Sequence, residues 1–486
     1  MLLSSSTPAA REGIEDWRGH CVGSPPLDAR VEPWMSELMD RSHLQELVAQ
    51  HGSPLNLVST SPMRSNLGQL NQVAEERNLD FQAFFARKSN KCLAFVDEAK
   101  QCGAGIDTAS ENEVRQCLKR GMDPIQIICT AAVKSDSLIR LCLEKAICIA
   151  VDNHDELRVV ADLADDLACK AVVALRLGGF QHDGQKLQTR FGFDVDHDQQ
   201  VLCELAELPV IVVGIHFHLD GYDASQRVCG IRESIRWIQR LRDLGHSPSF
   251  IDMGGGFPIS YLQSQRQWND FWQQHQRALL GQRDPVTYRN HPLGRHVSGK
   301  TVVGKPNSYP YYQTPVRQDW LASILDAETD HRTIADQLRE SKIQLRCEPG
   351  RSLMDGCGMT VARVEFRKQN ANRDWLIGLS MNRTQCRTSS DDFLVDPIVV
   401  PMETSETSDP ISGYFVGAYC TESELLSLRR MEFPGGIRRG DLVVFPNTAG
   451  YLMHFLESRS HQFPLAKNVV VSDDGEGRFD LDGIDR

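Results

Sequence analysis

Three features that mark common protein classes are missing from this sequence. It has 14 cysteines but no Cys-x-x-Cys pair, which gives little support to a zinc site or a disulfide framework and favours reduced thiols. No segment approaches the roughly 20 apolar residues of a membrane span. No basic tract offsets the net charge of -12, which argues against nucleic-acid binding. These absences favour a protein that acts on small molecules.

The amino-terminal segment also lacks a targeting signal. MLLSSSTPAAREGIEDW has neither the basic region nor the long apolar run of a secretory signal peptide. We therefore expect a cytoplasmic protein without membrane contact. At 486 residues the chain is long enough for one large domain and a smaller one.

Apolar runs of strand length alternate with helical patterns through the middle of the chain. Segment 110–121 has the signature of a helix, with a Ser110-to-Glu113 capping box and Gly121 at its end. Segments 154–168 and 225–245 have apolar residues at i, i+3 and i+4, as amphipathic helices do. Eight strand-like runs lie around and between them: 83–88, 103–109, 125–131, 147–152, 171–177, 210–218, 249–254 and 343–348. Such alternation predicts parallel βαβ units, arranged as a (β/α)8 TIM-type barrel or as an open doubly wound sheet.

Polar side chains at the ends of these runs favour the barrel. Barrel enzymes place their chemistry at the carboxyl ends of the strands. The eight runs end, in order, at Lys88, Asp107, Thr130, Asp152, Arg176, His218, Asp252 and Glu348.

The flanking regions have other patterns. We expect residues 1–60 to form a leader with one or more strands that join a β domain, and residues 61–352 to form the barrel. A long insert interrupts the barrel at about 259–342, and loops of that length are usually functional or disordered. Short strand-like pieces after residue 352, including 414–420, predict a carboxy-terminal all-β domain over 353–486.

Four groups at the predicted rim together describe a site for pyridoxal 5'-phosphate. Lys88 follows a buried strand, where a partly desolvated amine could form a Schiff base; the alternative is a rim lysine that extends to solvent. Gly254-Gly255-Gly256 and Arg351 follow the seventh and eighth strands, where barrels often bind phosphate. Taken singly, the glycines could form a plain turn and Arg351 a surface ion pair. Glu348 could protonate a pyridine nitrogen.

His216 and His218 share one strand face and could form a metal pair. The other rim positions offer no histidine, so we expect no metal site. His218 is better interpreted as a ring that stacks on the cofactor, and His216 as a hydrogen-bonded core histidine.

The order of the motifs resembles that of the fold type III pyridoxal-phosphate decarboxylases, which include diaminopimelate and ornithine/arginine decarboxylases. The matching segments are FFARKSN (84–90), GAGIDTASENEV (103–114), VALRL (173–177), TRFGFD (189–194), GIHFHLDGY (214–222), DMGGGFP (252–258), EPGR (348–351), GAYCTESE (417–424) and NTAGYLM (447–453). The resemblance implies a Lys88 aldimine with pyridoxal phosphate. It also implies a cofactor site lined by Asp107, Arg176, His218, Gly221, Gly255, Gly256, Glu348, Gly350, Arg351 and Tyr451.

The same resemblance implies decarboxylation of an amino acid, either a diamino acid or an amino-acid conjugate, through a quinonoid that Cys420 reprotonates. Catalysis would then rest on Lys88, His218, Glu348 and Cys420, and a homodimer would share its active sites. A racemase or epimerase on the same fold, or an inactive binding homologue, is the alternative, and Cys420 could be an inert thiol.

The substrate segments depart from the family pattern. Asp220-Gly221 stands where the family has Gly-Ser, Thr421 replaces an acid after Cys420, and CRTSSDDFLVD (386–396) replaces the usual substrate segment. Candidate substrate residues are Arg351, Asp391, Asp392, Thr421 and Glu422. Asp396 is a further candidate for a distal amine, although these aspartates could equally be solvated loop acids.

Overall fold

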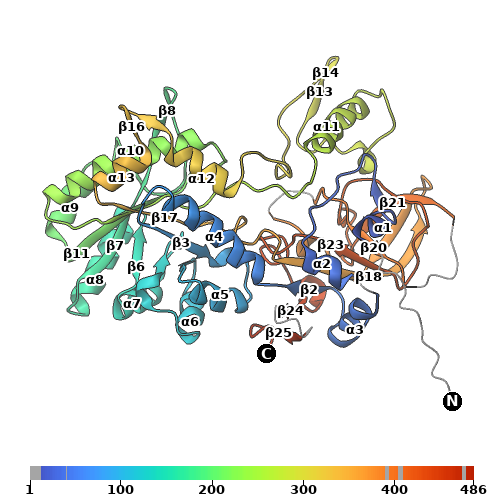
Figure 1. The fold of residues 1–486 in the computed structure, drawn as a ribbon, viewed down its shortest axis with the longest axis horizontal. Helices are drawn as coiled ribbons and strands as arrows, with labels where there is room; N and C mark the ends of the chain where they lie inside the picture. Colours follow the sequence, from blue (N-terminus) through green and yellow to red (C-terminus); the bar gives the residue numbers. More distant parts are fainter. Residues whose placement is uncertain (1–12, 40, 389–392, 403–408, 473–477) are drawn as a thin grey trace.

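The structure is a computed structural model that describes residues 13–39, 41–388, 393–402, 409–472 and 478–486. A barrel lies at one end of its long axis and a second sheet at the other (Figure 1). No helix within these described ranges is both long enough and apolar enough to cross a membrane.

Eight parallel strands close into the barrel. Their order is β7, β11, β12, β17, β3, β4, β5 and β6, and β6 pairs with β7 to complete the circle. The bounds are Phe81–Ala86 (β3), Gly105–Thr108 (β4), Ile127–Cys129 (β5), Cys148–Val151 (β6), Ala171–Gly178 (β7), Val210–Phe217 (β11), Phe250–Asp252 (β12) and Gln344–Cys347 (β17). The predicted barrel is therefore confirmed, and the open sheet is wrong. A short β10 (Phe193–Asp194) extends β7.

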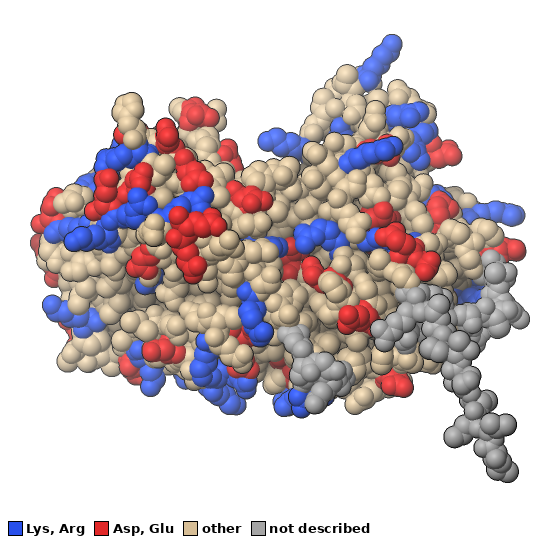
Figure 2. Space-filling model, in the orientation of Figure 1, with Lys and Arg blue, Asp and Glu red and all other residues tan. Residues whose placement is uncertain are grey.

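Helices cover the outside of the barrel. They are α4 (Ser61–Glu75), α5 (Ala94–Gln101), α6 (Glu111–Lys119), α7 (Asp136–Lys145), α8 (His154–Asp166), α9 (Val201–Glu207), α10 (Ala224–Asp243), α12 (Arg317–Leu325) and α13 (Ile334–Glu340). Their apolar faces bury against the strands in one continuous core. On the face shown in Figure 2, acidic and basic side chains are intermixed over these helices.

The start of α6 shows how local sequence fixes a helix end. Ser110 caps the helix, and its side chain accepts a hydrogen bond from the amide of Glu113 at 3.3 Å. The Glu113 carboxylate accepts from the amide of Ala109, at 2.7 Å, rather than from that of Ser110. The first hydrogen bond of the predicted capping box is therefore present, whereas the second goes to the amide one residue before the cap.

The second sheet gathers strands from both ends of the chain. β2 (Leu55–Val58) lies between β18 (Gly358–Gln369) and β24 (Lys467–Val471). The other strands are β1 (Val22–Gly23), β19 (Trp375–Leu379), β20 (Ile398–Val400), β21 (Ile411–Val416), β22 (Met431–Phe433), β23 (Leu442–Phe445) and β25 (Phe479–Leu481). Helices α1 (Ile14–Arg18), α2 (Pro33–Leu38) and α3 (Arg41–His51) lie beside it (Figure 1).

The segment predicted as an insert (259–342) is divided between the barrel and the second sheet domain. Helix α11 (Gln265–Leu279) and the hairpin β13–β14 (His296–Ser298, Thr301–Val303) lie toward the second sheet, and Phe271 and Tyr311 join its core (Figure 1). Helices α12 and α13 instead complete the barrel wall between β12 and β17. The segment is therefore mostly folded structure rather than one long loop.

Candidate active site

Lys88 lies directly after β3, in a short 3-10 turn over Arg87–Ser89. Its Nζ donates to Asp107 Oδ2 at 2.7 Å, and Asp107, in β4, is fully buried. Pairing of Ala86 with Asp107 across β3 and β4 brings the two side chains to the same rim. Thr130 donates its hydroxyl proton to the other oxygen of Asp107. The lysine is therefore held by a carboxylate that has no contact with solvent.

The charge of Lys88 is stabilised by its surroundings. Burial opposes the ammonium, but the carboxylates of Asp107 and Glu348 outweigh that effect, and the pKa of Lys88 lies above its ordinary value. The side chain is 36% exposed. A reacting group can therefore reach the amine, but it meets it in the protonated form.

Glu348 follows β17, which pairs with β3, so Glu348 and Lys88 end adjacent strands. Its Oε1 lies 3.1 Å from His216 Nε2, and Asp252 completes a group whose ligand atoms lie within 4.8 Å of one another. Burial raises the pKa of Glu348, against the effects of Lys88 and Arg176, and burial together with Glu348 raises that of Asp252. A buried carboxyl group beside the cations Lys88 and Arg176 is a suitable hydrogen-bond partner for a heterocyclic nitrogen.

His218 lies at the end of β11, next to the aromatic ring of Phe191. The two rings meet edge to face with centroids 6.3 Å apart, and the guanidinium of Arg176 lies 4.1 Å from the Phe191 centroid. Arg176 also pairs with Asp152 at 3.2 Å. Burial, with Lys88 nearby, lowers the pKa of His218 to about 3. The imidazole is therefore neutral at ordinary pH and suited to lie over a flat ring.

The glycines after β12 and β17 lie too close to neighbouring protein atoms to carry a side chain. A Cβ on Gly255 would lie 2.9 Å from the carbonyl oxygen of Glu348, and one on Gly350 would lie 2.4 Å from the hydroxyl of Tyr451. Gly254 and Gly256 have φ of +67° and +83°, a region that favours glycine. This backbone can approach an anion closely. Gly221, at φ +81°, has open space around it.

Arg351 is not a surface ion pair. Its Nη1 donates to the Tyr261 hydroxyl at 2.9 Å, and its guanidinium lies 4.2 Å from the ring centroid of Tyr309 and 5.2 Å from that of Tyr451. Burial opposes its charge, but the tyrosines outweigh it and raise its pKa. Tyr261 and Tyr309 were missed in the sequence because both lie in the segment interpreted as an insert.

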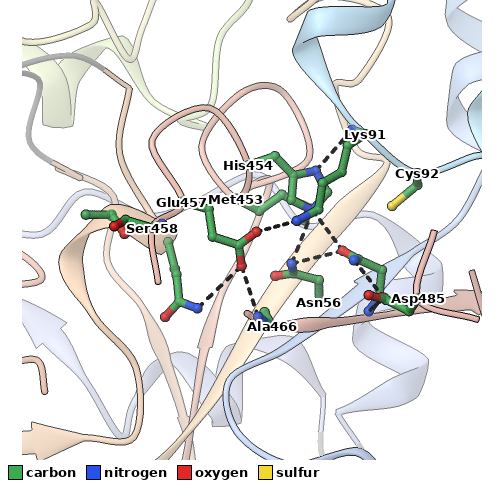
Figure 3. A network of polar contacts seen from close by, with 12 residues as sticks. Asn56, Lys91, Cys92, Met453, His454, Glu457, Ser458, Ala466 and Asp485 are labelled. Atoms are coloured by element: carbon green, nitrogen blue, oxygen red, sulfur yellow. Dashed lines mark hydrogen bonds and ion pairs between the residues drawn. The ribbon is translucent and has the colours of Figure 1, made fainter. Parts of the chain in front are cut away.

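The Lys88 turn is tied to the second sheet domain. The backbone amide of Tyr451 donates to the Ser89 carbonyl at 2.8 Å. Figure 3 shows the neighbouring network, in which Lys91 pairs with Glu457 and the Lys91 amide donates to His454 Nδ1 at 3.3 Å. Both domains therefore fix the position of the lysine.

Apart from Arg351, the residues predicted to contact substrate or to donate the proton are not placed at this rim by any contact among the described residues. Cys420 is exposed on a loop, because β21 ends at Val416 rather than continuing through 420. Thr421 and Glu422 follow it and are also exposed. Among the described residues, no hydrogen bond or ion pair joins Cys420 to the barrel rim. Asp391 and Asp392 lie outside the described residues.

Asp396 has a structural partner. Its carboxylate pairs with the fully buried Arg429 and accepts from the amides of Gly23, at 2.8 Å, and Leu27, at 3.1 Å. The acid therefore joins the amino-terminal segment to the second sheet domain, and it does not act as a solvated loop acid.

Comparisons with known proteins agree with this arrangement. Residues 65–285 match the family described as pyridoxal-dependent decarboxylase, pyridoxal binding domain. The uncharacterized protein y4yA of Sinorhizobium fredii is 33% identical over 445 residues, which cover 90% of this chain and 92% of that one. Diaminopimelate decarboxylase of Halalkalibacterium halodurans is 26% identical over 77% of this chain and 84% of its own.

Solved structures share the fold. Diaminopimelate decarboxylase from Helicobacter pylori, complexed with L-lysine, superimposes with a TM-score of 0.67 at 18% identity, covering 90% of this chain and 95% of that one. Lysine/ornithine decarboxylase from Vibrio vulnificus, complexed with putrescine, gives 0.64 at 17% identity, covering 91% and 99%. The chain belongs to the pyridoxal-dependent decarboxylase family. It is a decarboxylase whose cofactor is pyridoxal 5'-phosphate.

The residues at the rim fit this cofactor. A lysine amine, a neutral imidazole, a buried carboxyl and a glycine backbone surround the same strand ends. His216 Nδ1 and Asp252 Oδ2 are buried without a hydrogen-bond partner among the described residues. Such polar atoms are costly to leave unpaired, and they lie beside Glu348, where a ring nitrogen would be held.

Proposed function

We propose that the protein removes the α-carboxylate of an amino acid as CO2, with Lys88 holding the cofactor and Glu348 holding a proton at the cofactor's ring nitrogen. The observation that carries the proposal is the buried Glu348 carboxyl beside the rim lysine. Pyridoxal phosphate, when bound, supplies the electron sink for the electrons that the departing carboxylate leaves behind. A protonated ring nitrogen strengthens that sink.

Each neighbouring residue has a defined task in this proposal. Asp107 orients the Lys88 amine and keeps it charged until a proton is removed. His218, as a neutral imidazole, would cover one face of the cofactor ring, and the backbone at Gly255 and Gly256 would bind the phosphate. His216 holds Glu348 in place by a hydrogen bond, and Asp252 lies beside it in the same buried group.

We also propose that two chains form a homodimer in which Cys420 of one subunit donates a proton to the substrate Cα in the other. The support is an exposed apolar patch beside the Cys420 loop, formed by Phe455 (53% exposed), Leu456 (36%), Phe463 (37%) and Leu465 (36%). Tyr419, next to Cys420, stacks on Phe463 with ring centroids 6.1 Å apart. A second copy of the chain would cover this patch and move Cys420 out of solvent.

Subunit mixing tests the shared site. Lys88→Ala and Cys420→Ala proteins should each be inactive, and their mixture should recover up to about a quarter of the wild-type rate after random exchange. Cys203→Ala, at another exposed cysteine, is the control and should remain active alone. Demonstrated exchange without any recovery would refute the shared site.

The proposed substrate is a diamino acid or an amino-acid conjugate. Arg351 is the support, because among the described residues its guanidinium pairs with tyrosines and with no carboxylate, so it can still accept an anionic group. Release of CO2 from a panel of L- and D-diamino acids and their acyl conjugates tests the proposal, with Lys88→Ala as the blank. A panel without CO2 release above that blank would contradict it.

A further inference from the structure

Arg227 is a fully buried arginine that none of the interpretations above uses. It lies in the first turn of α10, and its side chain reaches back to the loop that follows His218. Its Nη2 donates to the carbonyl oxygens of Leu219, at 2.8 Å, and Gly221, at 2.7 Å. Its Nη1 also donates to the Asp223 carbonyl oxygen at 3.5 Å, so one cation binds three backbone carbonyls around the loop at the mouth of the barrel.

This cation has no anionic partner among the described residues. The nearest acids are occupied, since Asp220 accepts from the amide of Gly221 at 2.9 Å and Asp223 accepts from the amide and hydroxyl of Ser225, at 2.8 and 2.6 Å. The Nε of Arg227 is buried and has no hydrogen-bond partner in the described part of the chain. Burial lowers the pKa of Arg227 to about 10, against the weaker effects of Asp223 and Asp220.

Two other buried arginines have a carboxylate partner, whereas Arg87, like Arg227, donates to backbone carbonyls and has no ion pair among the described residues. Arg429 pairs with Asp396, and Arg317 pairs with Asp355. A buried charge without a counterion is costly to keep. The cost at Arg227 is understandable if an anion completes the site.

Arg227 lies against the glycine backbone that we propose as the phosphate site. A Cβ on Gly256 would lie 2.4 Å from Arg227 Nη2 and 3.2 Å from the Gly221 carbonyl oxygen. The guanidinium therefore touches the glycine backbone after β12. On another side it lies 5.5 Å from the ring centroid of Trp320 in α12, whose Nε1 donates to the Tyr222 carbonyl at 2.8 Å.

We propose that Arg227 is a positioning residue for the phosphate monoester of the cofactor, and that it acts through the loops at Gly221 and Gly256. Carbonyl oxygens at Leu219 and Gly221 would repel a phosphate dianion if they faced it. Bonding to Arg227 holds them toward the cation and leaves the backbone at Gly255 and Gly256 for the anion. The dianion in turn compensates the buried positive charge.

Binding of the cofactor with and without its phosphate tests the proposal. Full-length protein stripped of cofactor is titrated with pyridoxal 5'-phosphate and with pyridoxal, and the ratio of the two dissociation constants is measured. Arg227→Met should reduce the preference for the phosphorylated form by about 10- to 100-fold. Arg227→Lys, which restores the charge but not the two-carbonyl contact, should recover part of it.

Arg232→Met is the matched control. Arg232 lies further along α10, at the surface, and pairs with the exposed Asp330, so its loss should leave the ratio unchanged. If the methionine variant does not fold, Arg227→Lys alone decides, with an expected loss of about 3- to 10-fold. A wild-type ratio in any folded Arg227 variant overturns the proposal. The readout needs no turnover, so an error in the proposed substrate or dimer does not affect it.

Discussion

Replacement of Asp107 by asparagine should make the Lys88 amine far more reactive in the cofactor-free protein. The carboxylate lies 2.7 Å from Lys88 Nζ and is itself fully buried. Asparagine keeps the shape of the side chain and removes its charge. We therefore expect the pKa of Lys88 to fall, although Glu348 and Tyr451 still raise it.

The size of the effect follows from the geometry. An opposite charge this close shifts a pKa by about 1 to 3 units, and the 36% exposure of the Lys88 side chain places the effect below the upper limit because water screens the pair. We take about two units. Because the fraction of neutral amine grows tenfold for each unit that the pKa falls, acylation of Lys88 at pH 9 should be about 100-fold faster.

Residue-resolved mass spectrometry after brief treatment with an amine-directed acylating reagent measures this rate. The exposed Lys300 provides an internal standard. Asp152→Asn is the matched control, since Asp152 is a rim carboxylate that pairs with Arg176 instead. An unchanged acylation rate at Lys88 in Asp107→Asn would show that the Asp107 carboxylate does not stabilise the charged form of Lys88.

Three further outcomes are expected. Glu348→Gln should retain the cofactor but release CO2 slower by orders of magnitude, because an amide cannot keep a proton at the ring nitrogen; a wild-type rate would leave Glu348 with a structural role only. Burial lowers the pKa values of His216 and His218 in the folded protein, so the unfolded chain binds more protons below about pH 6.5. Folding stability should thus fall as the pH drops from 6.5 toward 4, by up to about 1.4 kcal/mol per pH unit for each histidine. Urea titrations over this pH range should show a shallower fall of the unfolding free energy in His216→Asn. An equal dependence on pH in the variant and the wild type would refute this reasoning. Asp482→Ala should lower the free energy of unfolding by about 1 kcal/mol. The Asp482 carboxylate accepts from the amides of Leu93 (2.8 Å) and Ala94 (2.9 Å) at the start of α5. An unchanged urea midpoint in the variant would exclude a capping role.

The sequence alone was sufficient for the barrel and its rim. A strand is recognised from a short apolar run, and in a closed parallel barrel all carboxyl ends meet at one edge. Lys88, Asp107 and Glu348 were therefore expected at the same rim before any distance was known. The Ser110 cap was also predictable, because a helix end depends on residues within one turn.

The interpretation of residues 259–342 as a single insert failed for a physical reason. The segment is rich in Gly, Pro and Tyr, which is typical of loops. It nevertheless contains α12 and α13, which complete the barrel, and α11, which packs on the second sheet. Which core a helix joins depends on the apolar surfaces of distant segments. Those surfaces have no signature within the helix itself.

Tertiary structure alone decided the partners of the polar side chains. His216 and Glu348 are 132 residues apart in sequence and meet because β11 and β17 flank β12. Asp396 pairs with Arg429, whereas Arg227 is buried with three carbonyls and no acid among the described residues. Residue type and hydrophobic period are local properties that a sequence displays. The choice between a solvated acid, a structural ion pair and an unpaired buried cation depends on which surfaces exclude water, and only packing of the whole chain determines that.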